Sequence, residues 1–186
     1  MRFNAGSGPV GCLLIGKTMR MRALQERLTA RGVLTVSASG EGDLLSAAQE
    51  GLVAARQPGG ACVAAEGELW AAALALAVQL SVERVALIAP TDRCALPGSD
   101  WDRQIERLKG FARRNLFFCV CDVLVMEGEA DARSARRLDL LCRRLCNARV
   151  HRVSLLDQRW TNCEFSPVEA VARFLRDGDF RISLAK

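Results

Sequence analysis

Residues Gly11–Thr18 read GCLLIGKT, an apolar run set between two glycines and followed by lysine and threonine. A short continuous apolar run of this kind is typical of a strand that is buried on both faces, as in a parallel sheet. The same residues also match the pattern G-x-x-x-x-G-K-T, in which a loop wraps a nucleotide phosphate. The stretch therefore predicts either the first strand of an α/β domain or a nucleotide site.

The surrounding residues favour the strand. A phosphate-binding loop follows a strand, but residues 2–10, RFNAGSGPV, contain two glycines and a proline, which are poor strand formers. The interior of the pattern is Cys-Leu-Leu-Ile, whose apolar side chains favour a buried strand over a loop that binds phosphate through its backbone N–H groups. Asp122 could position magnesium at the end of a strand, but the apolar run resumes directly after it. A nucleotide site at Gly11–Thr18 stays as an alternative only.

The rest of the chain alternates apolar runs with helical patterns. Further strands are predicted at residues 33–37, 61–65, 84–89, 116–126 and 149–156. Helices are predicted at residues 20–31, 44–57, 68–80, 100–114, 134–146 and 167–176, with Asp43 and Pro167 at favoured first positions. This alternation predicts an α/β fold: a three-layer sandwich whose six-stranded, mainly parallel sheet is covered by helices on both faces. We expect one domain over residues 1–186, strand order 2-1-3-4-5-6 and no cap domain.

Composition narrows the function classes. Half of the 186 residues are hydrophobic and a quarter are charged, which is the balance of a globular protein. The net charge of +5 is too small to argue for nucleic acid. No apolar run reaches the roughly 18 residues that cross a membrane, and no signal peptide is recognised. We expect a cytoplasmic protein whose partner is a small molecule or a protein, and a homo-oligomer is left open.

Eight cysteines raise the question of disulfides and metal sites. Cys12, Cys62, Cys119 and Cys121 lie inside apolar runs, where cysteine behaves as a small hydrophobic residue. A helix would place Cys142 and Cys146 on one face, but no convincing second pair completes a zinc site. The spacing favours buried thiols, with no metal and no cofactor.

Several stretches follow one another in an order known from one enzyme family. Residues 61–77, ACVAAEGELWAAALALA, resemble a nucleophile strand, its sharp turn and the next helix. Asp122–Asp131, DVLVMEGEAD, resembles a strand and the loop that carries a catalytic acid, and residues 166–175, SPVEAVARFL, resemble a closing helix. Together with GCLLIGKT at an oxyanion strand, the stretches resemble the α/β-hydrolase family. The resemblance covers about residues 10–175, lacks the family's two leading strands, and implies a ligand site at the carboxyl ends of the strands.

The catalytic triad of that family carries over only in part. Where the family has Gly-x-Ser-x-Gly, this chain reads AEGEL, so that Gly67 takes the nucleophile position without a side chain. Asp131 matches the acid. The position of the histidine, after the last strand, reads LDQRW around Gln158, and the single histidine, His151, lies inside the preceding strand as a packed or edge residue. The resemblance thus implies a degenerate triad, in which the serine mechanism cannot run.

Polar residues still gather at the predicted carboxyl ends of the strands. The candidate ligand-binding residues are Gly16, Lys17, Glu66, Glu68 and Arg159. Our first hypothesis is a non-catalytic domain that binds a small ligand or a protein partner there. One alternative is a hydrolase with a rearranged site that uses Glu66 or Glu68 with Asp131, although carboxylates at these positions also stabilise a helix start. The other alternative is the nucleotide site at Gly11–Thr18.

Overall fold

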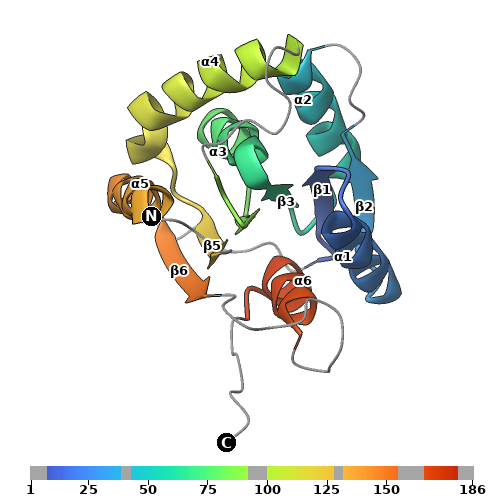
Figure 1. The fold of residues 1–186 in the computed structure, drawn as a ribbon. Coiled ribbons are helices and arrows are strands. Elements are labelled where there is room, and N and C mark those ends of the chain that lie inside the picture. Colours follow the sequence, from blue (N-terminus) through green and yellow to red (C-terminus); the bar gives the residue numbers. More distant parts are fainter. Residues whose placement is uncertain (1–7, 39–42, 92–99, 128–131, 155–165, 180–186) are drawn as a thin grey trace, which may run out of the picture.

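A computed structural model describes residues 8–38, 43–91, 100–127, 132–154 and 166–179 of the chain (Figure 1). Its sheet has six strands in the order β2-β1-β3-β4-β5-β6, and every neighbouring pair is parallel. The strands are β1 (Gly11–Ile15), β2 (Leu34–Ser37), β3 (Ala61–Glu66), β4 (Arg84–Ile88), β5 (Asp122–Glu127) and β6 (Arg149–Ser154). The helices are α1 (Met19–Ala30), α2 (Leu44–Ala55), α3 (Trp70–Gln79), α4 (Asp100–Asn115), α5 (Ala132–Arg144) and α6 (Pro167–Asp177), with short 3-10 helices η1 (Gly67–Leu69) and η2 (Leu116–Phe118). The predicted fold class and strand order are confirmed.

The helices form two layers, one on each face of the sheet. Helices α2, α3, α4 and α5 pack on one face, and α1 and α6 pack on the other (Figure 1). Neighbouring residues of a strand point to opposite faces, so Leu13 joins the first layer while Cys12 and Leu14 join the second. All residues of β1 are buried, which explains why its sequence is a continuous apolar run.

The position of β1 rules out the nucleotide-binding alternative. Residues Cys12–Leu14 pair with β2 on one side and with β3 on the other. Their backbone N–H groups and carbonyls therefore belong to the sheet, and their side chains fill the core. A phosphate-binding loop needs these N–H groups to face the ligand. The hypothesis of a P-loop at Gly11–Thr18 is wrong for this reason.

Two predicted segments differ from the structure. The strand predicted at residues 116–126 begins only at Asp122, because Leu116–Phe118 form η2 and direct Phe117 and Phe118 into solvent. Helix α5 ends at Arg144, before Cys146, which is exposed rather than buried. The cysteines placed in apolar runs are buried as predicted, namely Cys12, Cys62, Cys119 and Cys121.

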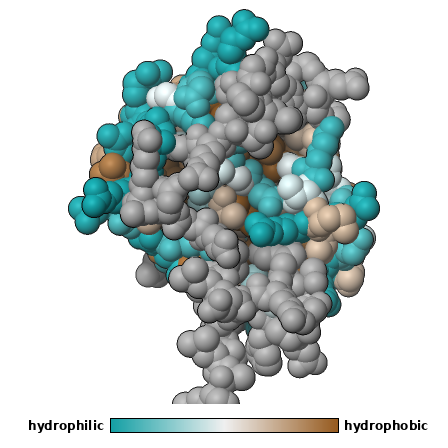
Figure 2. All heavy atoms as spheres, in the orientation of Figure 1, coloured by the Kyte–Doolittle hydropathy of each residue, from teal (hydrophilic) through white to brown (hydrophobic). Residues whose placement is uncertain are grey.

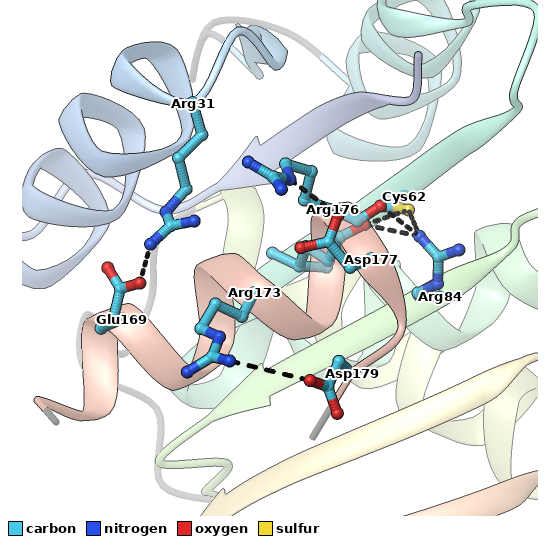
Figure 3. A network of polar contacts seen from close by, with 9 residues as sticks. Arg31, Cys62, Arg84, Glu169, Arg173, Arg176, Asp177 and Asp179 are labelled. Carbon is cyan, nitrogen blue, oxygen red and sulfur yellow. Dashed lines mark hydrogen bonds and ion pairs between the residues drawn. The ribbon is translucent and has the colours of Figure 1, made fainter. Parts of the chain in front are cut away.

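Polar contacts attach the closing helix α6 to the rest of the fold (Figure 3). Arg84 of β4 donates to the carbonyl oxygens of Leu175 at 2.7 Å and Arg176 at 3.1 Å. Arg31, directly after α1, forms an ion pair with the nearly buried Glu169. The helix is therefore fixed to both β4 and α1, in the place that the resemblance implied for a closing helix.

The surface of the described residues offers no membrane-spanning element. Among them, no helix combines the length and the apolar character needed to cross a bilayer. On the face shown in Figure 2, the coloured side chains are mainly hydrophilic and apolar atoms appear in small patches.

Candidate functional site

A sharp turn joins β3 to α3 at the position that the sequence resemblance assigns to the nucleophile. Glu66 ends β3, and Gly67 follows with a φ of +61° at the start of η1. This left-handed backbone favours glycine, because any other residue would have a Cβ atom that clashes with its own main chain. A Cβ atom on Gly67 would meet only Thr91 Cγ2, at 3.8 Å, within the part of the chain that the structure describes. The turn is thus present, and no other side chain of the described residues would contact a Cβ atom at this position.

Thr91, just beyond β4, connects this turn to its neighbours. Its backbone N–H donates to the carbonyl oxygen of Gly67 at 3.3 Å. Its own carbonyl oxygen accepts a hydrogen bond from Trp70 Nε1 at 3.1 Å. Ala89, between β4 and Thr91, has a φ of +44° and donates to the carbonyl of Met126 at 2.8 Å. The ends of β3, β4 and β5 are therefore tied together around Gly67.

On the other side of the turn, Glu66 contacts the start of α1. Its carboxylate accepts hydrogen bonds from Thr18 Oγ1 and, at 3.5 Å, from Arg20 Nη1. Thr18 also caps α1 by accepting from the N–H of Met21 at 3.3 Å. The side chain of Glu66 is only 11% exposed. These contacts give Glu66 a role in joining β3 to α1. A threonine directly before a helical pattern is a sequence signal that identifies Thr18 as the N-cap of α1.

Gly16 and Lys17 lie in the same loop with different surroundings. Gly16 has a φ of +145°, and a Cβ atom there would lie 3.0 Å from Met21 Cγ and 3.6 Å from Glu66 Cβ. Only glycine fits this approach without displacement of a neighbour. Lys17 is exposed. The structure therefore brings Gly16 and Glu66 together, as the sequence predicted.

The remaining predicted site residues have mixed outcomes. Glu68 in η1 is partly buried, and one of its carboxylate oxygens has no contact with solvent. His151 lies in the edge strand β6 and packs edge-on against Phe174, with ring centroids 6.2 Å apart. This confirms the prediction of a packed residue. Asp131, Gln158 and Arg159 lie outside the described residues, as does Asp157.

Beyond Thr91 the structure has a cavity of about 340 Å³ that the sequence did not indicate. Its walls come from α4 and α5, and Trp70 and Thr91 form the end next to Gly67. The apolar lining residues include Trp70, Leu116, Leu138, Leu140 and Leu141. The charged lining residues are Glu106, Lys109, Arg113, Arg137 and Arg144.

Among the residues that the structure describes, four cations and one carboxylate line this cavity, so this part of its lining is positive. Lys109 is only 1% exposed, and its Nζ lies 2.7 Å from Glu106 Oε1, whose side chain is 61% exposed. The guanidinium of Arg113 lies 6.0 Å from the centroid of the Trp70 ring, within the range of a cation–π contact. The one available sequence signal is Lys109 itself, which follows the buried Ile105 at helical spacing and thus shares the inward face of α4.

Comparison with known proteins rests on structure alone. No protein-family model matches the chain, and no curated protein matches its sequence. Solved structures with a similar fold include the esterase domain of a Rhodothermus marinus protein, with 21% identity, a TM-score of 0.56, and coverage of 80% of this chain and 78% of that chain. The fold is that of the α/β hydrolases. One of the two metagenome-derived lipolytic enzymes LipS and LipT has 11% identity and a TM-score of 0.62, with 91% of this chain and 90% of that chain covered. The dienelactone hydrolase from Anabaena variabilis has 14% identity and a TM-score of 0.57, with 91% and 85% covered.

Proposed function

We propose that this chain is a non-catalytic α/β-hydrolase-like domain that binds a small ligand at the carboxyl ends of its strands. The observation that carries the proposal is Gly67, which occupies the nucleophile turn with a positive φ and no side chain. The sequence adds a second reason, because its single histidine is His151 inside β6 and no histidine follows that strand. A serine-type mechanism needs both groups, since the base activates the nucleophile.

The cavity beside Thr91 is the place that we propose for the ligand. A concave site with apolar walls and a few convergent polar groups suits a small molecule better than a flat protein surface. The apolar residues favour an organic body, and the cations Lys109, Arg113, Arg137 and Arg144 favour a negative group on it. We therefore propose an organic anion with an apolar part as the class of ligand.

The contacts of Glu66 argue against the alternative of a rearranged hydrolase. Its carboxylate already accepts from Thr18 and Arg20, so a reaction through Glu66 has to give up its hydrogen bond with the residue that caps α1. An ester assay separates the two functions. We expect no turnover of p-nitrophenyl acetate or p-nitrophenyl butyrate above the rate in buffer. Saturable turnover that is lost in Glu66→Gln or Asp131→Asn would establish the rearranged hydrolase instead.

A fluorescent anion tests the binding site directly. The probe is 8-anilinonaphthalene-1-sulfonate, whose emission rises when it enters an apolar site. We expect saturable binding to the folded protein, at least tenfold weaker in Arg113→Met and in Lys109→Met. Arg114→Met is the matched control, because Arg114 is the next residue of α4, is exposed and does not line the cavity. Equal affinities of all three variants and the parent protein would refute the cavity as the site.

A further inference from the structure

Two cysteine side chains lie in contact just before β5. The Sγ atoms of Cys119 and Cys121 are 3.4 Å apart. Both residues belong to the core, with Cys119 fully buried and Cys121 7% exposed. Residues two apart in an extended segment point to the same side. Val120 between them is accordingly 64% exposed, while the two thiols face inward.

The backbone on both sides holds this pair in place. The N–H of Cys119 donates to the carbonyl of Leu116 at 3.0 Å, which closes η2. The N–H of Asp122 donates to the carbonyl of Glu83 at 3.3 Å, and β5 then pairs with β4. The segment of Cys119–Cys121 is therefore fixed at each end, and its thiols stay close together without a large rearrangement.

The thiol of Cys119 differs in acidity from the other buried cysteines. A hydrogen bond from Cys121 stabilises the thiolate of Cys119 and lowers its pKa, whereas the same contact raises the pKa of Cys121. By contrast, burial raises the pKa of Cys62 to about 11 and also raises the pKa of Cys12. The thiols of Cys62 and Cys12 donate to the carbonyls of Leu175 and Leu13. Cys12 and Cys62 thus serve as buried comparison cysteines, and Cys62 in addition has Arg84 Nη1 at 3.8 Å from its Sγ.

We propose that Cys119 and Cys121 form a redox-active dithiol that hydrogen peroxide converts into an intramolecular disulfide. The Cys119 thiolate attacks one peroxide oxygen, the O–O bond breaks, and Cys119 becomes a sulfenic acid as hydroxide leaves. The sulfur of Cys121 then attacks Cys119 Sγ, the S–O bond breaks, and water leaves with the thiol proton of Cys121. Hydroxide and the proton first taken from Cys119 make the second water. Two thiols and one peroxide thus give one disulfide and two waters.

The short ring makes this modification reversible. A disulfide that closes so few residues removes little entropy from the unfolded chain, so it adds little stability to the oxidised protein. Two molecules of a small thiol such as glutathione return the pair to the dithiol, with one glutathione disulfide as product. The inference does not depend on the ligand proposed above, since neither Cys119 nor Cys121 lines the cavity.

Peptide mass spectrometry tests the proposal on the native chain. Trypsin cuts after Arg114 and Arg133, which leaves Cys119 and Cys121 in one peptide. The reduced protein is exposed to peroxide while folded, then denatured, alkylated and digested. We expect this peptide to lose two hydrogen atoms and to resist alkylation. The peptides that carry Cys12 and Cys62 should remain alkylated to at least nine-tenths under the same conditions.

Two further arms make the result decisive. In Cys121→Ser, whose hydroxyl group can still donate to Cys119, Cys119 should stop at the sulfenic acid, which dimedone traps, whereas Cys119→Ala should leave Cys121 no more reactive than Cys62. A parallel oxidation in urea shows what the unfolded chain does without the fixed geometry. The proposal is refuted if Cys119 and Cys121 of the native protein are still alkylated after exposure to peroxide, or if they are oxidised to sulfinic acid without a disulfide. It is also refuted if the native and unfolded chains give the same mixture of disulfide pairings.

Discussion

Replacement of Gly67 by alanine tests the turn on which the functional argument rests. A non-glycine residue in the left-handed region costs about 1–2 kcal/mol. Loss of the freedom of glycine in the unfolded chain returns about 0.4–1 kcal/mol. Among the described residues the new methyl group would meet only Thr91 Cγ2 at 3.8 Å, which is an ordinary contact without a steric penalty. The expected net loss in free energy of unfolding is about 1 kcal/mol, or about 2–4 °C in Tm for a chain of this size.

Urea unfolding measures this loss, and Gly32→Ala supplies the matched control. Gly32 has a φ of +73°, and a Cβ atom there would meet nothing within 4 Å among the described residues. The two variants should therefore lose the same free energy within about 0.5 kcal/mol. A loss above about 3 kcal/mol at Gly67 alone would show that the space over the turn is filled, which contradicts the geometry argued above. No loss at either site would refute the reasoning from positive φ.

The serine version of the same substitution addresses catalysis. Gly67→Ser should be about as stable as Gly67→Ala, and it places a hydroxyl group at the nucleophile position. We expect no ester turnover from it, because the single histidine is held in β6 against Phe174 and cannot act as its base. Saturable turnover in Gly67→Ser would show that a base is present. The parent chain would then lack only the nucleophile, and the argument from the missing histidine would be refuted.

Two further substitutions test the fold. In Gly11→Ala the new Cβ would lie 1.6 Å from the main-chain oxygen of Ala55, so we expect the free energy of unfolding in urea to fall by about 3 kcal/mol or more. A fall below about 1 kcal/mol would contradict the packing of α2 on β1. Asp43 caps α2, and its hydrogen bonds from Ser46 lower its pKa, so Asp43→Ala should cost about 1 kcal/mol at pH 7. Because the folded pKa is the lower one, this contribution is present above about pH 4 and is lost as the pH falls through the folded value. A cost of Asp43→Ala that is the same at pH 7 and pH 2.5 would contradict the role of the carboxylate.

Much of the fold could be predicted because its four central strands are buried on both faces. GCLLI and ACVAA are apolar throughout, so each strand is visible as a run without reference to its partners. The strand predicted at residues 116–126 begins too early, because an apolar run is not always a sign of burial and these residues are in part exposed. Phe117 and Phe118 are 59% and 62% exposed, and the strand begins only when the chain reaches Asp122 beside β4.

The candidate site divides along similar lines. The turn at Gly67 follows from local sequence, because it requires only a strand, a glycine and a helix in succession. The cavity does not, because α3, α4 and α5 each supply part of its wall and no local pattern records how they meet. The contact between Cys119 and Cys121 could be predicted only in part. Their spacing predicts a common side, but only the three-dimensional structure shows that the two thiols touch.

Glycine at position 67 also lowers the strain energy of the turn. In an active α/β hydrolase the nucleophile occupies a strained turn, and this strain is a cost of order 1–2 kcal/mol that the chemistry requires. Here the turn has the same left-handed backbone, but glycine adopts it without that strain. The hydrogen bond from Thr91 to Gly67 and the start of α3 at Trp70 both depend on the turn and not on a side chain above it. The hydrogen bond from Thr91 and the packing of α3 therefore account for the turn, and a glycine at this position fits the non-catalytic binding domain that we propose.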